Sequence, residues 1–135
     1  MSKKTGCTLL FISEIFDEWR LLKLILEGER NDEVITCIPD FHKIQSVVER
    51  EQVDLVLLTF VIDKRDSFLL YQQLRSIPSL RETPVLFWRV PRPKAVYSQA
   101  QQFGIAGCIH YIFQPQDLLA ARDAVLAGGT YYPPP

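Results

Sequence analysis

The residues of this sequence that offer chemistry stand at the ends of short apolar runs. They supply hydroxyls, a carboxylate, a guanidinium and a phenol, at Ser13, Glu14, Thr59, Arg89 and Tyr111. If the runs are parallel strands, their ends meet at one edge of a sheet, where polar groups that converge can bind a small molecule. Arg89 and Glu14 can also form an ion pair there. The competing interpretation of Arg89 is a solvated cation at a strand end.

The other reactive side chains do not indicate an enzyme or a metal centre. The cysteines, Cys7, Cys37 and Cys108, have no CxxC spacing and no His cluster, so we expect buried thiols in a reducing compartment. His110 has no carboxylate near it in the sequence, and we expect a packed or surface histidine instead of a catalytic base. No GxGxxG or GxxxxGKS/T loop occurs. We therefore expect no enzymatic activity, no metal and no cofactor.

The elements that must position these groups alternate along the chain. Apolar runs typical of buried strands occur at 7–12, 33–38, 53–60, 84–90 and 107–112. Between them, apolar residues recur at helical spacing at 14–27, 41–51 and 67–76. Proline and glycine signals predict two further helices, at 94–103 and 115–127. This alternation predicts an α/β fold with a parallel sheet covered on both faces. The leading topology is a flavodoxin-like, doubly wound, five-stranded sheet of order 2-1-3-4-5 in three α/β/α layers.

Individual residues predict where helices begin, end and pack. Gly28 is expected to end the first helix, whose buried face includes Phe16 and Trp19. Asp40 is expected to cap the following helix. Trp88, in the fourth apolar run, is expected to pack in the core or at its edge.

Length and charge fit one soluble domain with a short tail. The chain has 135 residues, 47% of them apolar, and a net charge of −1, which argues against a membrane or nucleic-acid binder. The apolar run at 55–62 is too short for a membrane span, and that at 7–12 is too short for a signal peptide. We therefore expect a cytoplasmic domain over 1–130. The proline-rich tail at 131–135 is expected to begin a linker and to pack little after Tyr131.

With these features in place, the sequence resembles the receiver domains of bacterial two-component response regulators, over about 7 to 132. The stretches that carry the resemblance are VDLVLLTF, PVLFWRV and GIAGCIHYIFQPQDLLAARDAVLAGGTYYPP. The last is similar to receivers of the LuxR/NarL-type subfamily, where such an ending leads through a linker into a DNA-binding domain. The resemblance implies a CheY-like fold, a signalling role and an attached output domain.

The positions that match the phosphorylation site of that family are degenerate. The family has an acidic pair where Ser13 and Glu14 stand, a phosphorylatable Asp at Thr59, a small hydroxyl residue at Arg89 and a Lys at Tyr111. The resemblance thus implies that this chain lacks the acceptor carboxylate, most oxygen ligands of Mg²⁺ and the balancing lysine. It predicts a receiver that is not phosphorylated.

Two functions follow from this interpretation. The first is a signalling and protein-interaction module that controls an attached output domain or a partner protein, with no membrane or nucleic-acid contact of its own. It would form a homodimer through the face that receivers commonly use, here Ala95, Val96, Tyr97, Tyr111, Leu119 and Arg122. The alternative is a ligand-binding pseudo-receiver, with a small molecule in the crevice at the strand ends lined by Ser13, Thr59, Arg89 and Tyr111.

Overall fold

The computed structural model describes residues 6–60, 67–91 and 93–134. Its strands are β1 (Thr8–Ile12), β2 (Glu33–Cys37), β3 (Leu55–Thr59), β4 (Val85–Val90) and β5 (Gly107–His110). Its α-helices are α1 (Phe16–Arg30), α2 (Phe41–Arg50), α3 (Ser67–Arg75), α4 (Pro93–Phe103) and α5 (Pro115–Leu126), and a 3₁₀ turn covers Pro78–Leu80.

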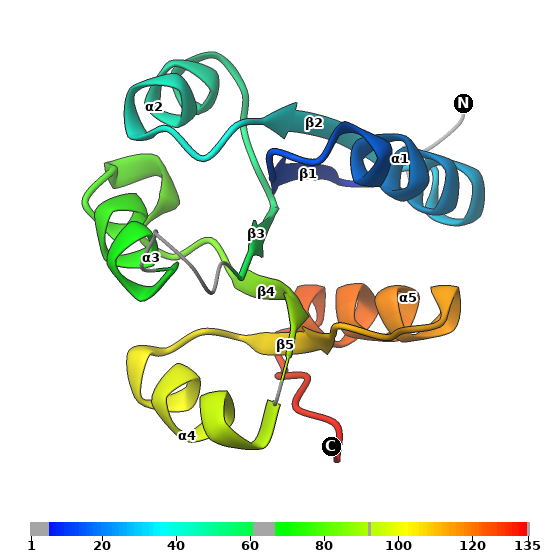
Figure 1. The fold of residues 1–135 in the computed structure, drawn as a ribbon. Helices are drawn as coiled ribbons and strands as arrows, with labels where there is room; N and C mark the ends of the chain where they lie inside the picture. The colour runs from blue at the N-terminus through cyan, green and yellow to red at the C-terminus, as the bar shows by residue number, and fades with distance from the viewer. Residues whose placement is uncertain (1–5, 61–66, 92, 135) are drawn as a thin grey trace.

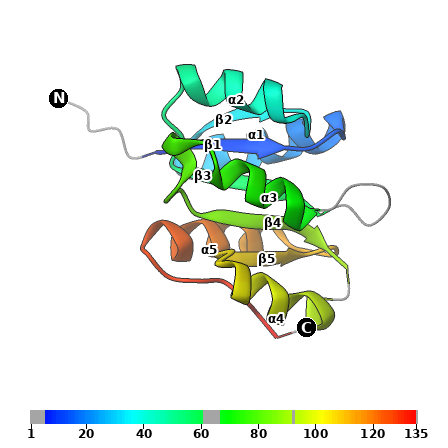
Figure 2. The same ribbon diagram turned by 90° about the vertical axis from the view of Figure 1, so that its left-hand side faces the viewer.

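The strands form one parallel sheet of order β2-β1-β3-β4-β5, which confirms the predicted fold class. Helices α2, α3 and α4 cover one face of the sheet, and α1 and α5 cover the other (Figures 1 and 2). Right-handed crossovers between parallel strands produce this division, and they place the carboxyl ends of all strands at one edge of the molecule. None of the helices in the described ranges is long and apolar enough to cross a membrane.

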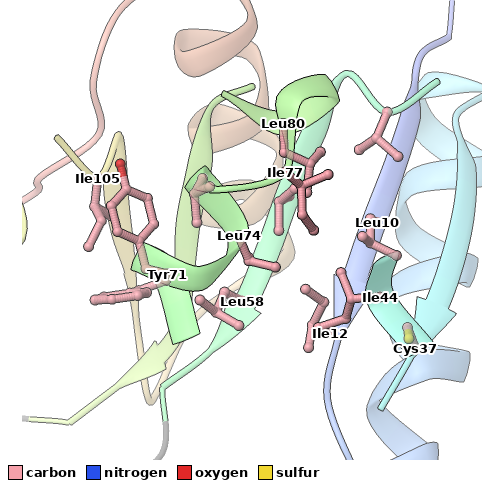
Figure 3. Close-up of a cluster of buried hydrophobic side chains, with 14 of the residues drawn as sticks. Leu10, Ile12, Cys37, Ile44, Leu58, Tyr71, Leu74, Ile77, Leu80 and Ile105 are labelled. Carbon is pink, nitrogen blue, oxygen red and sulfur yellow. The ribbon is translucent and has the colours of Figure 1, made fainter. Parts of the chain in front are cut away.

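Burial on both faces of the sheet explains why the strand sequences are continuously apolar. In β1, Leu10 and Ile12 pack under α2 and α3, whereas Leu9 and Phe11 pack under α1 and α5. Figure 3 shows the first of these clusters, in which Leu58 and other strand residues meet the helices. Each fully buried aliphatic side chain contributes about 1.5–3 kcal/mol relative to exposure, so the sheet carries most of the apolar stabilisation.

Local signals give mixed agreement with the structure. Asp40 caps α2 as predicted, because its Oδ1 accepts a hydrogen bond of 3.1 Å from the backbone N–H of Lys43. The prediction that Gly28 ends α1 was wrong. The helix continues to Arg30 and ends at Asn31, whose left-handed conformation (φ 57°) lets its N–H bond the carbonyl of Glu27. A glycine inside a helix costs only about 1 kcal/mol, so the later cap decides the end.

The predictions for the aromatic side chains were correct for the tryptophans and wrong for Phe16. Trp88 is fully buried, as expected, and Trp19 is half-buried. Phe16 was expected on the buried face of the first helix, but 63% of it is exposed. It is the first residue of α1, and its ring lies edge-on to that of Trp19 at 4.6 Å. The helical spacing was correct, but Phe16 stands at the very start of α1, where the sheet does not cover it.

The C-terminal tail closes the β5 edge of the sheet. The N–H of Tyr131 donates to the carbonyl of Ala106, and the carbonyl of Tyr131 accepts from the N–H of Cys108, both at 2.9 Å. Gly107 permits this approach, because a Cβ there would lie 2.3 Å from the Tyr131 oxygen. The expectation of little packing after Tyr131 was wrong for Tyr132, which is half-buried and donates its hydroxyl proton to the carbonyl of Ile105.

Candidate functional site

The carboxyl end of β4 carries a β-bulge at Arg89. The pairing of β4 with β5 shifts between Phe87 and Val90, and both of these residues pack on the α2–α4 side of the sheet. Trp88 packs on the opposite side, which leaves Arg89 as the extra residue. Its φ of 58° is left-handed, a conformation that costs a residue with a Cβ about 1–2 kcal/mol. The bulge directs the Arg89 side chain differently from that of a regular strand residue.

The guanidinium of Arg89 is bound to a buried carboxylate of α1. Its Nη1 lies 2.7 Å from Oε2 of Glu18, which is 5% exposed, while 30% of the Arg89 side chain is exposed. The other carboxylate oxygen, Oε1, accepts a hydrogen bond of 3.2 Å from the hydroxyl of Ser13. Both oxygens of Glu18 therefore have partners, one of them a charge-assisted bond. Glu18 also lies in the first turn of α1, where the helix dipole favours a negative charge.

Ser13 connects this carboxylate to the turn that follows β1. The residue is fully buried, and its Oγ accepts a hydrogen bond of 3.1 Å from the N–H of Ile15. Its carbonyl accepts a bond of 3.0 Å from the indole N–H of Trp19. A serine that bonds the backbone two residues onward holds a tight turn, so Ser13 fixes where α1 begins relative to the sheet.

Tyr111 lies against the guanidinium on another side. The Cζ atom of Arg89 is 4.2 Å from the centroid of the Tyr111 ring, a cation–π arrangement. Tyr111 follows β5 and is bonded through its N–H to the carbonyl of Val90, which holds it beside the bulge. The Nε of Arg89 is buried without a hydrogen-bond partner in the described ranges. The cation is thus enclosed by a carboxylate and an aromatic ring.

The structure therefore brings together Ser13, Arg89 and Tyr111, three of the residues predicted from the strand ends. Neither interpretation of Arg89 was correct: it is neither paired with Glu14, which is exposed, nor free in solvent, because it binds Glu18 and lies against Tyr111. Glu18 was missed because only strand-end residues were considered. An acidic residue one helical turn after Glu14, in the first turn of a helix, was the available signal.

Thr59 stands at the end of β3, the neighbouring strand, opposite Trp88 in the register. It is half-buried, and its carbonyl accepts a hydrogen bond of 3.4 Å from the hydroxyl of Ser67. Within the part of the chain that the structure describes, its own hydroxyl makes no hydrogen bond to Ser13, Glu18 or Arg89.

The five cavities that are lined by described residues lie away from this cluster. None of the five cavities described for residues 6–60, 67–91 and 93–134 is lined by Ser13, Thr59, Arg89 or Tyr111. The largest of them, about 700 Å³, is lined by residues that precede β3, β4 and β5, so it lies at the opposite end of the strands.

The residues expected at a dimer face divide between two parts of the molecule. Ala95 is exposed on α4, with Val96 and Tyr97 half-buried beside it. Tyr111 is 54% exposed.

Tyr97 connects His110 to the C-terminal tail. Its hydroxyl donates a proton to the carbonyl of Pro133 at 2.6 Å. The Nε2 of His110 lies 2.6 Å from the same Tyr97 hydroxyl oxygen and must therefore donate to it. His110 is thus a packed histidine, as predicted, and the tail is fastened to α4.

The two expected dimer-face residues on α5, Leu119 and Arg122, make contacts within the domain. Arg122 binds the fully buried carboxylate of Asp32 through Nη2 (2.6 Å) and Nε (2.9 Å), and this hydrogen bonding raises the pKa of Arg122 further above its ordinary range. Asp32 follows α1 and also accepts the N–H of Cys7, so Arg122 joins α5 to the amino ends of β1 and β2. Leu119, one helical turn earlier, is half-buried in the cluster on the α1–α5 side.

Comparison with solved structures identifies the fold. The receiver domain of the stress response regulator RcsB from Escherichia coli matches with a TM-score of 0.79 at 16% identity, covering 96% of this chain and 99% of that one. A two-component response regulator of the LuxR family from Aurantimonas matches with a TM-score of 0.80 at 14% identity, covering 93% and 89%. No protein-family model matches the sequence, and no curated protein does so significantly. The chain therefore has the fold of response-regulator receiver domains.

A third similar structure raises the question of a metal. The receiver domain of the sensor histidine kinase PA1611 from Pseudomonas aeruginosa, with magnesium coordinated in its active-site cleft, matches with a TM-score of 0.70 at 15% identity, covering 91% of this chain and 96% of that one. In this chain the buried carboxylate is already bound by Arg89 and Ser13, and a guanidinium repels a divalent cation. No group of three potential metal ligands occurs in the described ranges. The residues that the structure describes at this edge do not fit Mg²⁺.

Proposed function

We propose that this chain is a phosphorylation-independent pseudo-receiver, a signalling and protein-interaction module related to response-regulator receivers. The observation that carries the proposal is the ion pair of Arg89 and Glu18, held by Ser13 at the carboxyl edge of the sheet. This edge is where doubly wound sheets place their working sites. In this chain an internal cation and an internal carboxylate occupy it and form an ion pair with each other.

Electrostatics and nucleophile chemistry both support the absence of phosphorylation. Formation of an acyl phosphate requires a free carboxylate, and β3 ends in Thr59, a hydroxyl of very high pKa. The charge of the transferred group requires a metal ion and a lysine, whereas Tyr111 stands where the resemblance places the lysine. The permanently charged Arg89 supplies a fixed positive charge in their place. Such a module would not change state by phosphoryl transfer, and we assign it no enzymatic activity.

A module without a phosphate switch must act through contacts that are constitutive or set by another signal. We propose that it works in the cytoplasm, as a homodimer at micromolar concentration, and controls an attached output domain or a partner protein. Two consecutive large side chains at the carboxyl end of β5, Tyr111 and Ile112, are exposed and support this surface, and Ala95 is exposed on α4. Arg122 contributes little to it, because it is bound to Asp32.

Incubation with acetyl phosphate and Mg²⁺, followed by intact mass measurement, tests the central claim. We expect no added phosphoryl group on the unaltered chain or on Thr59→Asp, because Arg89, Glu18 and Tyr111 remain in place. A phosphorylatable receiver treated in parallel is the positive control. A base-labile gain of one phosphoryl group on the unaltered chain would overturn the proposal.

Sedimentation tests the mode of action separately. We expect a monomer–dimer equilibrium with a Kd of about 1–10 µM, weakened by Ala95→Glu. A chain that is entirely monomeric at about 100 µM would contradict dimerisation and leave the phosphorylation result unaffected.

A further inference from the structure

The two edges of the sheet differ. The β5 edge is closed by Tyr131, whereas β2 forms the other edge, between α1 and α2 (Figure 1). The N–H of Glu33 bonds the carbonyl of Cys7, and the carbonyl of Cys37 bonds the N–H of Ser13, so odd-numbered residues of β2 face β1. Because backbone groups alternate along a strand, those of Val34 and Thr36 face outward. No segment in the described ranges pairs with them.

A groove of about 480 Å³ lies beside this open edge. Its floor is formed by Thr36, Cys37 and Ile38, and one wall carries the rings of Phe16 and Trp19 from α1. The Phe16 ring is largely exposed, as described above. Aromatic side chains that stay in contact with water provide large contact area for a partner at low entropic cost.

The opposite wall is basic. It is formed by residues of α2, and its two charged members are Lys43 and Arg50. The groove lining contains no carboxylate, and neither cation has an ion-pair partner among the residues that the structure describes. The groove therefore presents aromatic surface on one side and positive charge on the other.

We propose that this groove binds an extended acidic peptide of a partner protein, which adds as a strand beside β2. In an added strand, successive side chains point to opposite faces, one toward α1 and the next toward α2. The peptide that fits alternates apolar residues, which cover Phe16 and Trp19, with acidic residues, which pair with Lys43 and Arg50. Its backbone would bond the outward groups of Val34 and Thr36.

A second copy of this chain fits the groove less well. If β2 paired with its own equivalent, the incoming strand would be EVITC, which carries a single carboxylate, Glu33, at one end. That strand does not alternate acidic and apolar residues, so it would leave one of the two cations of each groove without a partner. The charge and the spacing of the walls favour a foreign acidic strand.

The test uses two fluorescein-labelled eight-residue peptides, one alternating Val with Glu and one alternating Val with Lys. Fluorescence anisotropy is expected to show that the Glu peptide binds with a micromolar Kd. The Kd of the Lys peptide is expected to be higher by about tenfold or more. Raising the salt concentration from about 50 to about 500 mM is expected to weaken the binding of the Glu peptide, because salt screens its attraction to Lys43 and Arg50. On binding, the amides of Val34 and Thr36 are expected to gain protection from hydrogen exchange.

Two sets of variants distinguish binding by strand addition from non-specific binding of the peptide. Thr36→Pro removes an outward N–H and no bond to β1, and it is expected to abolish binding. Lys43→Glu with Arg50→Glu is expected to weaken binding about tenfold, whereas Arg81→Glu with Lys94→Glu, an equal charge change at exposed sites elsewhere, is expected to have no effect.

If Thr36→Pro does not fold, N-methylation of the peptide replaces it. Methyl groups on the amides that face β2 are expected to block binding, and methyl groups on the alternate amides to leave it unchanged. Equal binding of both methylated peptides, equal binding of the Glu and Lys peptides, no binding at about 1 mM, or self-association of the chain through this edge would each overturn the proposal.

Discussion

Arg89 reaches Glu18 from a strained backbone: its φ is 58°, and its Nη1 lies 2.7 Å from the carboxylate. The two residues are 71 positions apart, and the bond ties the start of α1, which follows β1, to the end of β4, with β3 lying between these two strands in the sheet. An unfavourable local conformation that persists in a fold must be offset by contacts elsewhere. The ion pair and the ring of Tyr111 are the contacts that offset it.

Removing the cation is expected to cost more stability than removing the anion. Arg89→Ala leaves Glu18 buried with only the Ser13 hydroxyl, and we expect a loss of about 2–4 kcal/mol in the free energy of unfolding by urea. Glu18→Gln keeps a hydrogen-bond acceptor, and the partly exposed Arg89 stays solvated, so we expect about 1–2 kcal/mol. The exposed Arg81→Ala serves as control, with a change within about 0.5 kcal/mol. Equal, small losses in all three variants would show that the pair adds nothing to stability.

The positive φ of Arg89 predicts that glycine is more stable than alanine at this position, the reverse of the usual order. Arg89→Gly is expected to be more stable than Arg89→Ala by about 1 kcal/mol, because glycine adopts a positive φ without a Cβ clash. At Glu33, an exposed position of β2, the order should be the ordinary one, with Ala more stable than Gly. Both pairs are compared by urea unfolding. The same order at both positions would mean that Arg89 is not strained in solution.

Burial of Cys108 predicts a loss of stability in alkaline solution. Desolvation raises the pKa of this thiol from its ordinary value of 9.0 to about 12 in the folded state. Below about pH 8 both states are protonated and the stability is full. Above that value the unfolded state ionises first, so the free energy of unfolding falls by up to about 1.4 kcal/mol per pH unit.

Urea unfolding between about pH 8 and pH 10.5 measures this slope. Cys108→Ala is expected to be less stable at pH 8 but to show a shallower decline. Ile109→Val, a neighbouring core truncation without a thiol change, should keep the slope of the parent chain. If Cys108→Ala keeps it as well, the thiol is not protected by the fold.

The tail is expected to belong to the folded domain through Tyr132. Truncation after Thr130 removes the two backbone bonds of Tyr131 and the packing of Tyr132, and we expect a loss of about 2–4 kcal/mol in urea unfolding. Truncation after Pro133, which keeps these contacts, should change stability by less than about 0.5 kcal/mol. Equal stability of both truncations would instead make residue 130 the end of the domain, as the sequence alone suggests.

The sheet was predictable because its strands are buried on both faces. Continuous apolar runs such as LVLLT in β3 have no other simple explanation when helical spacing lies on both sides of them, and the order of the strands follows from right-handed crossovers. The end of α1 was not predictable in the same way. An exposed Gly28 and a left-handed Asn31 compete over a few residues, and the energies that separate them are about 1 kcal/mol.

Three members of the site were predictable, whereas Glu18 and the bonds that it makes were not. Sequence position placed Ser13, Arg89 and Tyr111 at strand ends, and the sheet brings those ends together. The partner of Arg89 depends on a bulge, and no residue pattern indicates that an arginine will adopt a positive φ. The contact of Tyr132 was missed for a related reason. Three prolines suggest a spacer, whereas the small Gly107 on β5 lets Tyr131 pair with the sheet, which brings Tyr132 to the carbonyl of Ile105.

Each member of the ion pair has a tryptophan as its neighbour in the sequence, since Trp19 follows Glu18 and Trp88 precedes Arg89. These are the only two tryptophans of the chain. One indole donates to the carbonyl of Ser13, and the other is enclosed by Phe11 and Phe113. The intrinsic fluorescence of the protein therefore originates almost entirely beside this pair. Any partner or solvent condition that separates Arg89 from Glu18 is expected to shift the ultraviolet emission of the unlabelled chain, which makes the site its own optical probe.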